Sequence, residues 1–174
     1  MQFIMGRRVP SFTENGFHLT TIPPPLFEKV QKAFNEKMKN WDTLPLEREI
    51  DAVYTAPGKP SKMMYLGGLM NELHRELKPL HEAWAGGIEL VPTSIYGIRL
   101  YQNGSSLLMH VDKPETHVIS SIVHVAHEYD NDDEPWTIDI EGLDGQVHSI
   151  ALEPGQVRCV VLASLWWVLY ASDN

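Results

Sequence analysis

The stretch YGIRLYQNGSSLLMHVDKPETHVISSIVHV, residues 96–125, marks a change in the chain from helical to extended patterning. Its β-branched and aromatic residues come in short runs, separated by turn residues such as Asn103 and Gly104. Runs of this kind predict strands. We expect strands near residues 94–102, 107–111, 117–126, 137–141 and 147–152. Short strands at this spacing favour an antiparallel sandwich or barrel.

Two amphipathic helices are predicted before this stretch. Apolar residues recur at steps of three and four over residues 26–41, behind the prolines at 23–25, and again over residues 69–84. The glycines at 86–87 end the second pattern. Prolines and a glycine interrupt residues 42–62, which predicts an irregular connection. We expect both helices to pack outside the sheets, which makes the fold class α+β.

The length of 174 residues predicts one domain with a sizeable core. Within it we expect a helical support over residues 1–90, a β core over 91–156 and an atypical apolar tail over 157–174. The single cysteine, Cys159, cannot form an internal disulfide.

Charge and hydropathy exclude two classes of partner. The net charge is -9, without a basic cluster beyond Arg7 and Arg8, so nucleic-acid binding is not expected. The apolar run 160–171 is too short to span a bilayer, which needs about 20 apolar residues. At the N-terminus, two arginines and a proline end the hydrophobic start at once, so we expect no secretory signal and a cytoplasmic location.

The candidate chemistry lies in His110 and Asp112. Side chains two apart in a strand project to the same face, so both can point at one metal ion while Val111 points away. Imidazole plus carboxylate suits a borderline divalent ion, and a further histidine would complete the facial triad of non-haem Fe(II) oxygenases. The pair alone is a short pattern that many unrelated chains contain.

The flanking sequence gives this pair a family context. The stretch 96–125, followed by LEPGQ at 152–156, resembles the 2-oxoglutarate and Fe(II)-dependent dioxygenases, in the prolyl 4-hydroxylase-like branch. The resemblance covers about residues 94–156 and follows the family order: a strand with tyrosine, a polar glycine turn, the His-x-Asp pair, a long strand and a Pro-Gly turn. It implies a double-stranded β-helix, or jelly roll.

The resemblance also implies roles for single residues. His110 and Asp112 match the first two iron ligands, and no catalytic residue beyond the metal ligands is implied. Tyr101 matches the tyrosine that binds the distal carboxylate of 2-oxoglutarate. Ser120 and His124 share a strand face by parity and are candidates for the cosubstrate pocket. The implied cofactors are Fe(II) and 2-oxoglutarate, with ascorbate as a further candidate, and the implied reaction is hydroxylation of a prolyl residue or a small molecule.

The sequence departs from the family pattern after Gln156. Family members place a second histidine about ten residues after the Pro-Gly turn, where this chain has Trp166 and Trp167. They then carry a Lys or Arg for the cosubstrate carboxylate, whereas the last basic residue here is Arg158, too early in the chain for that role. We therefore expect the last core strands to be missing or altered, through a change of reading frame or splicing, which leaves open whether the chain is an active enzyme.

Several alternatives stay open from the sequence. His148 or His117 would replace the third ligand only if the fold brought it near the pair. Arg99 shares the strand face of Tyr101, so it either contributes charge to the pocket or forms an ordinary ion pair. The chain could also be a non-catalytic β-sandwich that binds a partner. A cupin-like metal protein is a third reading, because Gly104, His110 and Asp112 loosely follow the cupin spacing, although cupins usually carry histidine at the position of Asp112.

Overall fold

The computed structural model describes residues 15–47, 60–102, 105, 107, 110, 117–129 and 135–161. Its helices are α2 (Pro24–Met38) and α3 (Leu69–Trp84), with a short 3-10 turn, η1 (Trp41–Thr43). Its strands are β1 (Phe17–Thr21), β2 (Lys62–Met64), β3 (Ile98–Leu100), β4 (Ile119–Val123), β5 (Thr137–Glu141), β6 (Val147–Ala151) and β7 (Gln156–Val161).

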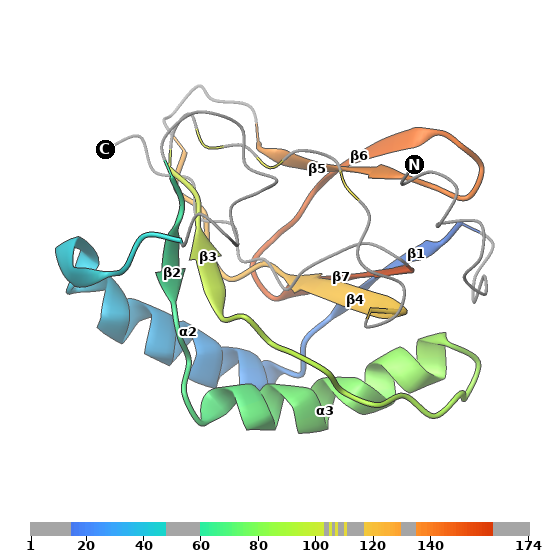
Figure 1. Cartoon of the computed structure of the whole chain (residues 1–174), viewed down its shortest axis with the longest axis horizontal. Helices are drawn as coiled ribbons and strands as arrows, with labels where there is room; N and C mark the ends of the chain where they lie inside the picture. The colour runs from blue at the N-terminus through green and yellow to red at the C-terminus, as the bar shows by residue number, and fades with distance from the viewer. Residues whose placement is uncertain are drawn as a thin grey trace.

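All strand pairs are antiparallel. The largest sheet among the described residues has the order β1-β7-β4, while β2 pairs with β3 and β5 pairs with β6. The helices lie on one side of the β1-β7-β4 sheet and the β5-β6 hairpin lies on the other (Figure 1). The large sheet therefore has a face towards the helices and a face towards the hairpin.

The helices follow from the expected local signals. Pro24 occupies the first turn of α2, where its fixed φ suits the helix and its missing N–H costs no hydrogen bond. Leu26, Val30 and Phe34, one turn apart, form its buried stripe. After α3, Gly86 and Gly87 both have positive φ and turn the chain away, so the predicted stop is confirmed.

The two faces of the large sheet contribute to two hydrophobic clusters. On the helix-facing side, buried residues of α2 and α3 pack with Val123, Val157 and Cys159. On the hairpin-facing side, Tyr101, Ile122 and Leu152 form a second cluster, against which side chains of β5 and β6 pack. We call this second cluster the inner core.

Most of the predicted elements are present, and the α+β class is confirmed. The strands predicted at 137–141 and 147–152 match β5 and β6, and those at 94–102 and 117–126 contain β3 and β4. Of the strand predicted at 107–111, only residues 107 and 110 lie within the described part of the chain. The double-stranded β-helix stays a prediction.

Three strands were not predicted: β1, β2 and β7. The most consequential is β7, because it includes the start of the segment predicted as an atypical tail and is the central strand of the largest sheet. Residues 162–174 of that segment lie outside the described residues. Within the described part of the chain, neither helix is long and apolar enough to cross a membrane.

Candidate functional site

Tyr101 directly follows β3 and is buried in the inner core, with 1% of its surface exposed. Ile122 of β4 belongs to the same cluster, and the ring of Trp136 lies edge-on to the phenol with 4.7 Å between centroids. Leu107 packs against this cluster three residues before His110. The inner core therefore brings Leu107 together with Ile122 in β4.

A buried polar network holds the phenol of Tyr101. Its oxygen accepts a hydrogen bond from Nη1 of Arg99 at 3.1 Å. Arg99 also forms an ion pair with Glu47, and the hydroxyl of Ser61 donates a hydrogen bond to the same carboxylate. Burial raises the pKa of Tyr101, so the phenol stays neutral at physiological pH. The sequence left two roles open for Arg99, a charge in the pocket or an ordinary ion pair, and the structure shows the ion pair.

Ser120 and Ile122 of β4 project to one face of the sheet, as their alternation requires, and His124, one residue past the end of the strand, continues the alternation. Ser120 and His124 are both buried, and Ile122 between them contributes to the inner core with Tyr101. Of the residues predicted to line the cosubstrate pocket, Tyr101 packs in one cluster with Ile122, and Ser120 and His124 flank that isoleucine in the chain. The fold therefore brings Tyr101 to the segment that carries the other two.

His124 is joined to a second histidine. Its Nε2 lies 2.8 Å from Nδ1 of His127, the two rings are stacked at 5.1 Å, and His127 stacks in turn on Tyr129 at 4.5 Å. Burial, followed by the charge of His127, lowers the pKa of His124 to about 4. At neutral pH His124 is therefore an uncharged imidazole. Its Nδ1 is buried and has no hydrogen-bond partner among the described residues.

The predicted iron ligands are described only in part. His110 is half-buried, while Asp112 lies outside the described residues. The shared direction of the two side chains therefore stays a prediction. Imidazole and carboxylate are donors that suit Fe(II), but they supply two of the three protein ligands of a facial triad.

His148 and His117, the two histidines considered as a third metal ligand, have other neighbours in the structure. His148 on β6 lies 3.3 Å from a carboxylate oxygen of Asp144, and its ring meets Phe17 edge-on at 4.8 Å. His117 lines a pocket beside α3. Among the described residues, no group of three or more His, Cys, Asp or Glu side chains is arranged to hold a metal ion.

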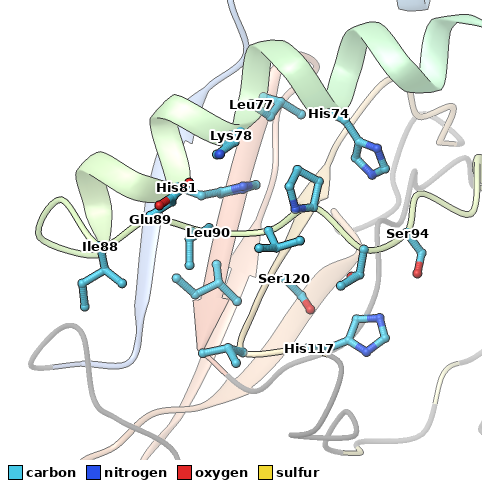
Figure 2. A pocket seen from close by; sticks show the side chains of 15 residues that line it. His74, Leu77, Lys78, His81, Ile88, Glu89, Leu90, Ser94, His117 and Ser120 are labelled. Atoms are coloured by element: carbon cyan, nitrogen blue, oxygen red, sulfur yellow. The ribbon is translucent and has the colours of Figure 1, made fainter.

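That pocket has a volume of about 400 Å³ and lies between α3, the segment 88–94 and residues 117–120 (Figure 2). Its walls are mainly apolar, with His74 and His81 on the helix side and His117 opposite. His81 makes a 3.0 Å hydrogen bond through Nε2 to the hydroxyl of Ser121, and burial lowers its pKa to about 4. A pocket of this size and polarity can enclose a small organic molecule.

Two residues of this pocket, Ser120 and His117, were candidates from the sequence, for the cosubstrate pocket and the third metal ligand respectively, and the others were missed. A helical signal was available, because His74, Leu77, Lys78 and His81 recur at steps of three and four on one face of α3. The opposite wall comes from irregular backbone, for which periodicity makes no prediction.

Comparison with known proteins adds no family assignment: no family model, no curated protein and no solved structure matches this chain.

Proposed function

We propose that this chain is a 2-oxoglutarate and Fe(II)-dependent dioxygenase-like protein, whose reaction class is hydroxylation of a prolyl residue or a small molecule. The observation that supports it most is the grouping of Tyr101, Ser120 and His124 around Ile122. The motif order gives Tyr101 a place in the cosubstrate pocket, and strand parity adds Ser120 and His124. The packing of Tyr101 with Ile122, which lies between those two residues in the chain, supports placing the three in one region.

The proposed roles of the chain are ligation, orientation and exclusion of water. His110 and Asp112 would hold the iron, which together with 2-oxoglutarate supplies the oxidising chemistry when bound. Tyr101 keeps a neutral phenol fixed by Arg99, so its orientation is preset before any ligand binds. Ascorbate remains a candidate reductant.

The pocket beside α3 is the proposed site for a small substrate or a substrate side chain. Ser120, one of the proposed cosubstrate residues, is among the residues that line it. Its apolar walls suit an aliphatic ring such as that of proline. We therefore expect substrate selectivity to respond to changes at Leu90 and Ile119, which line it.

Iron binding and turnover test the proposal together. Equilibrium dialysis under anaerobic conditions should show Fe(II) bound by the wild-type protein and lost in His110→Ala, while His18→Ala, which changes an exposed histidine of β1, should bind as wild type. Admission of oxygen with 2-oxoglutarate should then yield succinate. Equal iron binding by His110→Ala would remove the proposed ligand pair.

A non-catalytic β-sandwich is the second candidate, favoured by the lack of any histidine after Gln156 in the sequence. It predicts neither iron binding nor succinate from a folded protein. A cupin-like metal protein would instead bind metal through His110 with an affinity that 2-oxoglutarate leaves unchanged.

A further inference from the structure

The walls of the pocket beside α3 are joined to one another by hydrogen bonds. Nε2 of His81 on α3 lies 3.0 Å from the hydroxyl of Ser121 on β4, which connects the helix to the sheet. The backbone N–H of Leu90 donates to a carboxylate oxygen of Glu82 at 2.8 Å, which connects the segment 88–94 to the same helix. A pocket fixed in this way is formed before a ligand arrives, so its lining indicates which ligand it fits.

One lining side chain carries a buried polar atom that has no partner. Nε2 of His74 is buried, and none of the described residues forms a hydrogen bond with it. The ring of His74 lines the pocket from α3 (Figure 2). Most buried polar groups in proteins are hydrogen-bonded, because an unsatisfied one is unfavourable. A ligand in the pocket that supplied this hydrogen bond would remove the penalty.

Polar side chains gather at the end of the pocket where His74 lies. Ser94 and His117 lie at this end in Figure 2, whereas Ile88 and Leu90 lie towards the other end. A serine hydroxyl both donates and accepts hydrogen bonds, as does a neutral imidazole. The pocket is therefore amphipathic: one end suits a polar group, and the rest suits an aliphatic body.

The charged residues of the lining do not favour an ionic ligand. Lys78 and Glu89 have opposite charges, and Nζ of Lys78 already lies 3.4 Å from a carboxylate oxygen of Glu82. Burial lowers the pKa of His81 to about 4, so this imidazole is uncharged at physiological pH. An ionised ligand would lose its hydration on entry while the lysine is already compensated, which is unfavourable. An uncharged ligand avoids that penalty.

We propose that the pocket binds an uncharged amphipathic small molecule, with a compact aliphatic body between the apolar walls and a carboxamide or hydroxyl group hydrogen-bonded to Nε2 of His74. A carboxamide both donates and accepts, so it can satisfy this atom in either tautomer of the imidazole. That such a molecule is the substrate rests on the proposed function, whereas its binding requires no iron.

Three probes of matched shape and different charge test the ligand class. Cyclohexanecarboxamide, cyclohexanecarboxylate and cyclohexylmethylammonium are titrated into the iron-free wild-type protein, and binding is followed by ligand-observed NMR. We expect the carboxamide to bind at least about tenfold more tightly than either ion, since only the ions lose the hydration of a full charge. Tighter binding of either ion, or no binding of the carboxamide, would overturn the proposal.

Matched variants locate the binding site. His74→Phe should weaken carboxamide binding about threefold to tenfold, because the hydrogen bond to Nε2 is lost. His74→Gln should retain part of the affinity, and Leu90→Trp, which fills the pocket, should weaken binding at least about tenfold. The control is Arg75→Met, which changes an exposed side chain of the same helix and should bind as wild type.

Urea unfolding separates a binding role of His74 from a structural one. Without the probe, replacement of an unpartnered buried polar atom by an apolar ring should leave the unfolding midpoint unchanged or higher. The carboxamide should raise the midpoint of wild type more than that of His74→Phe, because a ligand of the folded state stabilises that state. A lower midpoint in His74→Phe, with carboxamide affinity unchanged, would assign His74 to the fold and refute the proposal.

The outcomes also distinguish this ligand from the proposed dioxygenase. Carboxamide binding that depends on His74, in a protein that binds no Fe(II) and forms no succinate, would retain the pocket ligand and reject the dioxygenase. Iron binding and succinate formation by a protein that does not bind the carboxamide would retain the dioxygenase and reject the pocket ligand.

Discussion

Arg99 and Arg158 are both buried guanidinium groups, and they differ in what compensates their charge. Arg99 has the carboxylate of Glu47, and Arg158 has the ring of Phe17. Loss of one partner from a buried ion pair leaves the other charge uncompensated, which is costlier than loss of a charge that had no partner. The two arginines should therefore respond in opposite ways when their surroundings are changed.

Substitution of Glu47 tests the Arg99 half of this contrast. Glu47→Gln should lower the free energy of unfolding by about 3–5 kcal/mol, because Arg99 would remain buried without its counter-charge. The control is Glu36→Gln on α2, whose salt bridge to Lys39 is largely exposed, so its loss should leave the unfolding midpoint nearly unchanged. Equal unfolding midpoints in urea for the two variants would contradict the assigned role.

His124 should make stability depend on pH. Its pKa is lowered from 6.5 to about 4 by burial, so between these values the unfolded chain binds more protons than the folded one. The free energy of unfolding should therefore fall as the pH falls through this window, by up to about 1.4 kcal/mol per pH unit from this residue. His124→Gln should remove that contribution from the measured slope.

At the scale of elements, local periodicity predicted the helices well, because each has a buried stripe at helical spacing and a proline or glycine at one end. It failed for β7. A central strand is buried on both faces, so QVRCVV lacks the alternation that identifies a half-buried strand and resembles an apolar tail. The residues of β2 were too few to give any period.

Gly97 immediately precedes β3 and has a φ of 111°, a backbone conformation that favours glycine. It also lies close to β2, because a Cβ added there would be 2.6 Å from the Met64 carbonyl oxygen. Gly97→Ala should therefore destabilise the fold by about 2 kcal/mol or more. Gly145→Ala is the matched control, since that position also has a positive φ but open space around the new atom. Equal losses in denaturant unfolding would show that the close approach is unimportant.

At the scale of the whole molecule, some residues of the candidate site could be predicted from the sequence, whereas their neighbours in the fold could not. Tyr101, Ser120 and His124 were named from motif order and strand parity, and they share the inner core or its face. Arg158 was dismissed because its place in the chain differs from that of the family's basic residue. Antiparallel pairing sets β7 directly beside β4, although the two strands are far apart in the chain. Only the register reveals that neighbourhood.

The most direct test of a 2-oxoglutarate and iron site in this fold is an anaerobic absorption titration of 2-oxoglutarate into the Fe(II)-loaded protein. We predict the weak visible charge-transfer band of a chelated complex in wild type and none in His110→Ala. A folded wild-type protein that gives no band at saturating iron and 2-oxoglutarate would contradict the proposed function.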